Sequence, residues 1–470
     1  MAARKAGLFT PPQSGPRTVA VLPFRNLSGD KSHDYFAEGL SEQIRTVLSR
    51  NPKLQVMAPT SVAAAMEASA EVLAIAKKLD AAYLLDGSVR HRGDQVRITA
   101  RLTEAAGGTV AWTDQLDRSV SDIFAAQDDI AGLVERALKA QTADGAAPHL
   151  DMGGTRSAKA FDAYLLGNGY AKLVDGEGGG RAALAQYDAA IVADPKYAEA
   201  YAGRARMIVY LATSFGKASE LEGAYDEAIA SVRRAAELAP QLPFVQAALG
   251  NVLIHARLDF KGASAPFARA RELGSGDAKV MGYVANYYAY MGQHAEAASA
   301  AKRATELDPL NPGAFSMAAF AAYCARDYAR GIDFARKALA LDSRLELGHF
   351  MIGDCLLQLG RANEGRSSYL AEPSELARLT GLAVAEWKLG NRPAAQQAYD
   401  TLAAELGDLA TYQFATILAQ WGRLDDAMAK LALAQKMTDT GLAMLKVDPK
   451  LDPLRGRPDF SALLRSFGFA

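Results

Sequence analysis

The chain has 470 residues, with 52 basic and 53 acidic side chains and a formal net charge of −1. A near-neutral chain lacks the excess of lysine and arginine with which proteins coat nucleic acid or an anionic membrane surface. Half of the residues are apolar and 22% are charged, which is typical of folded globular proteins rather than disordered ones.

The cysteines and the amino-terminal stretch indicate the compartment. Cys324 and Cys355 are too few for a disulfide framework or a cysteine-rich zinc site. No apolar run reaches the ~18 residues of a membrane-spanning helix. The basic start has no apolar segment before Pro11 and Pro12, so it does not resemble a secretory signal. We therefore expect a cytoplasmic protein with no cofactor, no metal, no nucleic-acid partner and no membrane insertion.

After a flexible arm over 1–17, the first part of the chain alternates between strand and helix patterns. Short apolar runs bounded by turn residues, and one run of strict alternation, predict strands at 19–24, 54–57, 83–90, 95–102 and 109–112. Apolar residues that recur every three or four positions predict helices at 34–49, 72–79 and 122–138. These patterns indicate a small α/β domain over 18–140.

Four segments of this domain follow a familiar order: VAVLPFRNLSGD, DYFAEGLSEQI, YLLDGSVRHRGDQVRITARL and DIFAAQDDIA. The region resembles the TolB amino-terminal-like domain of bacterial multidomain proteins. The resemblance implies that tetratricopeptide (TPR) repeats follow the domain. It also implies that an effector often precedes it: a class III nucleotidyl cyclase, a winged-helix DNA-binding domain or a protein kinase. Because only about 17 residues precede Val19, we expect no effector domain in this chain.

A repeat of 34 residues runs through the rest of the chain. Ser275, Pro309 and Ser343 end equivalent segments that are 34 residues apart, and 34 is the TPR period. Small residues return on the same frame: Ala297, Ala301 and Ala304 match Gly331, Ala335 and Ala338. After a linker over 141–155, we expect about seven or eight helix pairs over 156–445, stacked as an all-α right-handed TPR superhelix. The fold class is therefore α+β overall.

Three segments depart from this frame. Longer linkers are expected at 175–180 and 213–221. The glycines at 176–180 predict a flexible linker rather than a phosphate-binding loop, because no strand precedes them and no Lys-Ser/Thr pair follows. The tail over 446–470 places Phe460, Leu463, Leu464 and Phe467 on one face. We expect it to cap the last repeat, since a terminal unit must cover its apolar side.

No arrangement of residues in the sequence indicates catalysis. Paired carboxylates lie near predicted helix ends or on exposed faces, there is no nucleophile elbow, and no cysteine–histidine pair has catalytic spacing. Cys324 and Cys355 fall within predicted helices, where buried packing is the usual role. We therefore predict that the protein is not an enzyme.

Peptide binding is the positive prediction. In TPR arrays the first helix of each pair lines a concave groove, as the resemblance implies. Its inward positions here include Arg206, Tyr210, Asn251, His255, Lys279, Asn286, Tyr290, Phe320, Tyr323 and Asp354. Asn251 and Asn286 fall where related repeats use asparagine to hydrogen-bond a peptide backbone, because an amide can both donate and accept. Lys279 supplies a nearby cation, but the full two-carboxylate clamp of chaperone-binding repeats is absent. Each of these residues has packing or solvent exposure as its alternative role.

Three hypotheses about function remain at this point. The leading one is a scaffold that binds a peptide, a partner protein or a second copy of itself. The second is the sensory half of a split signalling system whose effector is a separate polypeptide. The third, a nucleotidyl cyclase, is disfavoured because no residues remain to build a catalytic domain with a metal-binding aspartate pair.

Overall fold

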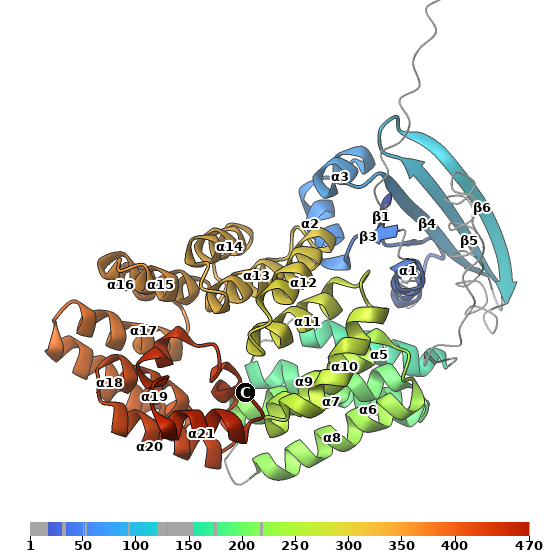
Figure 1. The fold of residues 1–470 in the computed structure, drawn as a ribbon. Helices are drawn as coiled ribbons and strands as arrows, with labels where there is room; N and C mark the ends of the chain where they lie inside the picture. The colour runs from blue at the N-terminus through green and yellow to red at the C-terminus, as the bar shows by residue number, and fades with distance from the viewer. Residues whose placement is uncertain are drawn as a thin grey trace, which may run out of the picture.

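The structure is a computed structural model. It describes residues 17–30, 34–49, 51, 54–92, 95–119, 129, 154–155, 157–172, 176–216 and 220–469. The predicted α+β class is confirmed: a small domain built on a sheet is followed by a long curved array of helices (Figure 1). Within the described residues, no helix is both long enough and apolar enough to cross a lipid bilayer.

The sheet of the first domain is mixed. Its strands are β1 (Arg17–Val21), β2 (Arg25–Asn26), β3 (Leu54–Val56), β4 (Tyr83–Arg92), β5 (Gln95–Glu104) and β6 (Thr109–Ser119). The order is β3-β1-β4-β5-β6, and β2 pairs with β4. Strands β3, β1 and β4 are parallel, whereas β4, β5 and β6 form an antiparallel meander.

Helices cover both faces of the parallel part of the sheet. Helix α1 (Asp34–Ser49) packs Leu40 and Ile44 against the face that carries Val19 and Val21. Helices α2 (Pro59–Ala68) and α3 (Val72–Leu79) cover the opposite face, which carries Ala20. The alternation follows from the period of two along a strand. Helix α2 and strand β2 were not predicted, and the helix predicted over 122–138 lies outside the described residues apart from Asp129.

The described part of the repeat region contains eight antiparallel helix pairs. They are α5 (Ala158–Lys172) with α6 (Gly176–Ala193), α7 (Ala198–Phe215) with α8 (Leu221–Leu238), α9 (Pro243–Arg257) with α10 (Phe260–Leu273), α11 (Ala278–Tyr290) with α12 (His294–Leu307), α13 (Pro312–Cys324) with α14 (Tyr328–Leu341), α15 (Gly348–Gln358) with α16 (Ala362–Leu370), α17 (Glu375–Lys388) with α18 (Arg392–Leu406), and α19 (Thr411–Gln420) with α20 (Leu424–Lys436). Helices α11 and α13 begin 34 residues apart, as do α12 and α14. The sequence period therefore corresponds to one helix pair.

Large aromatic rings on the second helix of a pair pack against small residues on the first helix. A Cβ atom on Gly250 of α9 would lie 2.5 Å from Cε2 of Phe267 on α10. A Cβ atom on Gly353 of α15 would lie 2.5 Å from Cε1 of Tyr369 on α16. Phe267 and Tyr369 are fully buried. The glycines thus let the paired helices approach closely, which is the physical basis of the repeat frame.

The prediction of a flexible linker at 176–180 is wrong. Helix α6 begins at Gly176, and these glycines form its first turns. A Cβ atom on Gly180 would lie 2.7 Å from Cδ2 of Leu211, so this glycine lets α6 approach α7. An exposed pair between Glu177 and Arg181, one turn apart, lies on the same helix. Packing against the next helix therefore outweighs the low helix propensity of glycine.

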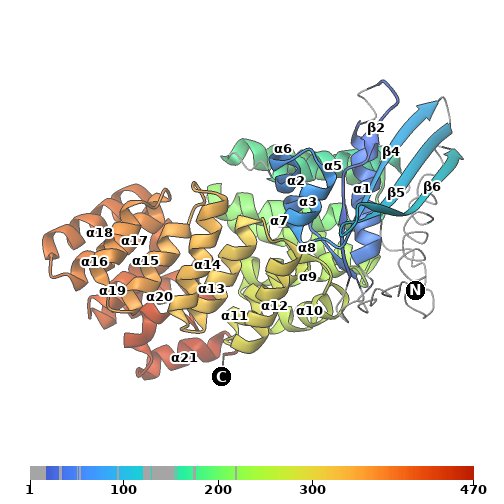
Figure 2. The same cartoon turned by 90° about the horizontal axis from the view of Figure 1, so that it is seen from above.

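The first domain rests on the loops at one edge of the array (Figure 2). The amide nitrogen of Ala58 donates to the carbonyl oxygen of Leu307 at 2.8 Å. Ser61 donates to Asp308 Oδ1 through its amide, at 3.0 Å, and through its hydroxyl, at 2.5 Å. Helix α1 also packs on α5, where a Cβ atom on Gly39 would clash with the ring of Phe161. The domain therefore contacts both the first helix pair and the loop between α12 and α13.

The C-terminal segment, defined here as residues 439–469, does more than cover the last pair. It contains the short helices η4 (Thr440–Met444) and η5 (Pro449–Leu454), followed by α21 (Pro458–Ser466). Phe460 and Leu463 of the predicted apolar face are buried, and Leu464 and Phe467 are partly buried. The segment then reaches α10, where the rings of Phe469 and Phe260 lie 4.7 Å apart (Figure 1).

Candidate binding surface

The first helix of each pair leaves one stripe of side chains accessible. On α11 that stripe consists of Lys279, Tyr283, Asn286 and Tyr290, whereas the residues between Val280 and Ala289 on the other faces are buried. The spacing of four, three and four residues places these side chains on one face of the helix. The stripe therefore runs along the axis of α11.

Neighbouring helices carry matching stripes. Eight of the ten residues that the repeat frame singles out are at least partly accessible: Arg206 and Tyr210 on α7, Asn251 and His255 on α9, Lys279, Asn286 and Tyr290 on α11, and Phe320 on α13. We call these side chains, together with Phe244 and Tyr283, the open surface. Whether they contact a partner remains a prediction.

Two cations and two rings form the centre of the open surface. The guanidinium of Arg206 lies 5.5 Å from the ring centroid of Phe244 and 5.2 Å from that of Tyr283. The ammonium of Lys279 lies 4.5 Å from the same Phe244 centroid. These are cation–π distances, and they tie α7, α9 and α11 together.

The sequence analysis missed Phe244 and Tyr283. Phe244 occupies the same repeat position as Lys279, so the frame already contained the signal that would have found it. Tyr283 lies one turn after Lys279 at a position that the frame does not mark as inward. Only the packing of α11 shows that it is accessible.

Further along α11 come the amide of Asn286 and then Tyr290, whose ring pairs with Phe320 of α13. Asn286 Oδ1 is buried and accepts no hydrogen bond from a described residue. One turn further, the ring of Tyr290 meets that of Phe320 edge to face, with centroids 5.4 Å apart. Burial raises the pKa of Tyr290 above its ordinary value.

His255 is the titratable group of α9 on this surface. Burial lowers the pKa of His255 to about 4. The imidazole is therefore neutral at physiological pH and adds no positive charge beside Arg206 and Lys279.

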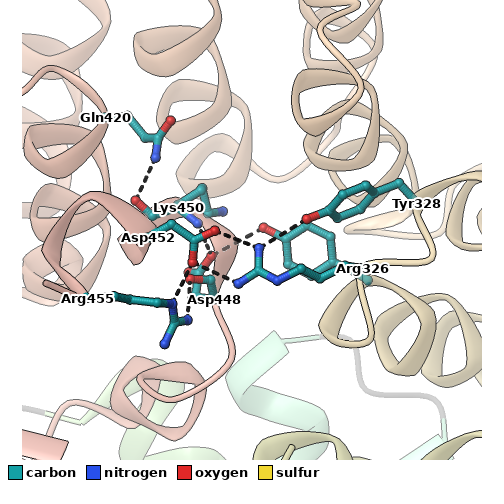
Figure 3. Close-up of polar contacts among 8 residues, drawn as sticks. Arg326, Tyr328, Gln420, Asp448, Lys450, Asp452 and Arg455 are labelled. Carbon is teal, nitrogen blue, oxygen red and sulfur yellow. Dashed lines mark hydrogen bonds and ion pairs between the residues drawn. The ribbon is translucent and has the colours of Figure 1, made fainter. Parts of the chain in front are cut away.

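The other two predicted groove residues, Tyr323 and Asp354, are covered by the C-terminal segment. The hydroxyl of Tyr323 donates to Asp448 Oδ1 at 3.2 Å, and that of Tyr412 donates to Asp448 Oδ2 at 3.0 Å. The backbone nitrogen of Lys450 donates back to Asp448 Oδ1 at 2.9 Å. Asp448 and Lys450 lie side by side in Figure 3. In this conformation, Tyr323 is not available to a partner.

Asp354 forms a buried ion pair with the same segment. Its Oδ2 atom lies 2.6 Å from Lys450 Nζ, and its Oδ1 atom accepts from the hydroxyl of Tyr369 at 2.7 Å. Burial raises the pKa of Asp354. Burial opposes the charge on Lys450, but the neighbouring Asp354 and Asp448 carboxylates raise its pKa overall. Asp354 is thus a structural partner of the C-terminal segment.

Hydrogen bonds and an ion pair nearer the surface also attach the C-terminal segment to the array. Arg326 pairs with both carboxylate oxygens of Asp452, at 2.7 and 2.8 Å, and also donates to the hydroxyl of Tyr328 (Figure 3). Gln420 donates to the carbonyl oxygen of Lys450 at 2.7 Å. Helices α13 and α19 and the turn between α13 and α14 therefore all contact residues 448–452.

Metal-binding groups and reactive thiols are the remaining candidates. Among the described residues, no cluster of three or more histidine, cysteine, aspartate or glutamate side chains has the geometry to hold a metal ion. Cys324 and Cys355 are buried, and burial raises the pKa of both thiols, that of Cys355 to about 12. Both are therefore unreactive thiols at neutral pH.

Comparisons with known proteins give partial matches. The sequence model of a family described as HilA/YgeH-like transcriptional regulator, second domain, matches residues 15–133. That stretch is the one expected to be a TolB amino-terminal-like domain, and the TolB resemblance stays a prediction. The chain is also 34% identical over 153 residues to putative adenylate cyclase 3 of Rhizobium meliloti (strain 1021). This match covers 32% of the chain and 26% of that protein, so the chain spans about a quarter of this relative.

Solved structures with similar folds have low sequence identity. The human IFIT1 dimer with m7Gppp-AAAA is 13% identical, with a TM-score of 0.45, over 88% of this chain and 98% of that one. PilF of Pseudomonas aeruginosa is 18% identical, with a TM-score of 0.33, over 43% and 90%. YrrB, described as a TPR protein with an unusual peptide-binding site, is 23% identical, with a TM-score of 0.26, over 39% and 87%.

Proposed function

We propose that the chain is a non-enzymatic cytoplasmic scaffold that binds a peptide, or an extended segment of a partner protein, on the open surface. The observation that supports this proposal is that one part of the groove is covered by the C-terminal segment and another part is open. The C-terminal segment covers Tyr323 and Asp354, whereas the stripes of α7, α9 and α11 remain accessible. A protein whose groove served only to seat its own tail has no need of a second accessible stretch rich in aromatic and amide side chains.

The chemistry of the open surface suits an extended polypeptide. Asparagine side chains on two successive first helices, Asn251 and Asn286, can donate to and accept from a peptide backbone. The rings of Tyr283, Tyr290 and Phe320 offer apolar area for side chains. Because an extended chain alternates its side chains, it can engage both kinds of group as it runs over the open surface.

Site-specific photo-crosslinking in native cells tests this function. A photoreactive phenylalanine analogue replaces Tyr283 on the open surface and, in a matched control, Val192, which is 82% exposed on α6. We expect a discrete crosslinked polypeptide only at position 283, and its loss when Asn251 and Asn286 are both changed to alanine. Equal crosslinking at 283 and 192, or no effect of the asparagine changes, would contradict the proposal.

A second function is favoured by the comparisons. The relative named as a putative adenylate cyclase and the family model of a transcriptional regulator both point to signalling proteins. We propose as the alternative that the first domain, with bounds of about 18–140, acts with a separate effector polypeptide. Co-purification of a cyclase, kinase or DNA-binding protein with the chain supports this alternative. Purified chain with ATP or GTP and a divalent metal is expected to form no cyclic nucleotide.

A further inference from the structure

We propose that the ligand of the open surface is an extended peptide with an acidic side chain at one end and an apolar side chain about five residues away. This inference rests on the proposed function and specifies the partner of the same surface. It follows from the positions of two cations beside Phe244, of the Asn286 amide further along α11, and of the ring pair of Tyr290 and Phe320 at the end of that helix.

The acidic end follows from the cations around Phe244. Arg206 on α7 and Lys279 on α11 both lie within cation–π distance of this single ring on α9, so two positive charges flank it. Arg206 makes no ion pair with a described residue. The nearby Arg204 differs, because it pairs with both Asp188 and Glu227. An anionic side chain from the ligand complements the charge on Arg206 and offsets the repulsion from Lys279.

The middle of the peptide is placed by Asn286. It lies seven residues after Lys279, or about 10 Å along the helix axis at 1.5 Å per residue. An extended peptide covers that distance in about three residues. Asn286 is partly accessible on the same stripe, so its side-chain amide can hydrogen-bond the backbone of the ligand at this point.

The apolar end is placed by Tyr290 and Phe320. Tyr290 lies eleven residues after Lys279, or about 16 Å along α11, which an extended peptide spans in about five residues. The two rings meet edge to face at 5.4 Å and are partly accessible. They therefore offer a rigid apolar platform rather than a charged one.

Selection from a random peptide library tests the inference on the full chain. A phage-displayed library of random 12-residue peptides is panned on the wild-type protein. We expect the selected sequences to be enriched in Asp or Glu placed four to six residues from Leu, Ile, Phe or Trp. One selected peptide is then synthesised, and its Kd is measured against the Arg206→Gln and Arg204→Gln variants.

The outcomes separate the inference from the proposed function. We expect Arg206→Gln to weaken binding about tenfold and to reduce its dependence on salt, since a charge-assisted contact is lost. Arg204→Gln, which removes an arginine that is already paired, is expected to leave Kd unchanged. Circular dichroism checks that both variants are folded. Selected peptides without the acidic residue, or an unchanged Kd for Arg206→Gln, overturn the inference while peptide binding stands. Failure to select any peptide overturns both.

Discussion

Lys450 and Asp354 are 96 residues apart in the chain, and Lys450 Nζ lies 2.6 Å from Asp354 Oδ2 inside the helical array. The two side chains expose only 8% and 3% of their surface. The pair fixes the C-terminal segment against α15, and thereby decides which part of the groove is closed.

Removing one member of this pair is expected to destabilise the fold. Lys450→Met leaves the Asp354 carboxylate buried without its counter-ion, so the free energy of unfolding is expected to fall by about 3–5 kcal/mol. Adding Asp354→Asn removes the charge and still accepts the Tyr369 hydrogen bond, so part of the loss is recovered. Urea unfolding followed by circular dichroism measures both effects. The exposed pair of Arg97 with Asp117 is the control, since Arg97→Ala is expected to leave the stability nearly unchanged.

Stability is expected to fall in mild acid because of His255. Burial lowers the pKa of this imidazole to about 4, below its unfolded value of about 6.5, so the unfolded chain binds the proton more readily. The contribution is complete above about pH 6.5 and is lost as the pH falls toward 4, amounting to about 3 kcal/mol. Thermal melts across this range should show a flatter profile for His255→Gln than for the wild type. Parallel profiles would show that other groups cause the dependence.

The contact between the first domain and the array is expected to depend on Ser61. Its hydroxyl donates to Asp308 and accepts from the amide of Leu310 at 2.9 Å. Ser61→Ala leaves the partly buried Leu310 amide without this acceptor, at a cost of about 1 kcal/mol. Hydrogen exchange should become faster at 54–61 and 307–311. Ser69, whose hydroxyl accepts only a local bond from the amide of Glu71 at an exposed site, is the matched control and is expected to change neither region.

Two glycines at the start of α6 are expected to respond in opposite directions to alanine. A Cβ atom on Gly178 meets nothing within 4 Å, so Gly178→Ala should stabilise the helix by about 0.5–1 kcal/mol. Gly180→Ala places its Cβ 2.7 Å from Leu211 and should lower the melting temperature. Thermal unfolding of the two variants gives the comparison. Equal and negligible effects would indicate that 176–180 is a flexible linker after all.

Local patterns in the sequence were sufficient for several elements. The helices expected at 34–49 and 72–79 have the bounds of α1 and α3, because an apolar face repeats with the period of the helix itself. Helix α2 was missed although Pro59 stands at its first position, where proline favours a helix start. The error at Gly176–Gly180 arose because propensity was weighed without the neighbouring helix, which only the fold supplies.

The binding surface was predictable only in part. The 34-residue frame located residues on the stripes of α7, α9, α11 and α13, because equivalent repeat positions take equivalent orientations. It did not locate Tyr283, and it placed Tyr323 and Asp354 in an open groove. Their actual partners, Asp448 and Lys450, lie 125 and 96 residues further along the chain, where no repeat signal connects them to α13 or α15.

The sequence by itself determined that this chain forms paired helices at a fixed interval. Each helix crossing needs small residues within one or two turns, so these residues recur in the sequence with the period of the repeat. Only the tertiary structure decided which stripe of the groove stays accessible. Curvature accumulates over successive pairs until the C-terminal segment meets helices far from it in sequence, and contacts across such distances arise from the summed geometry of the array rather than from any local pattern.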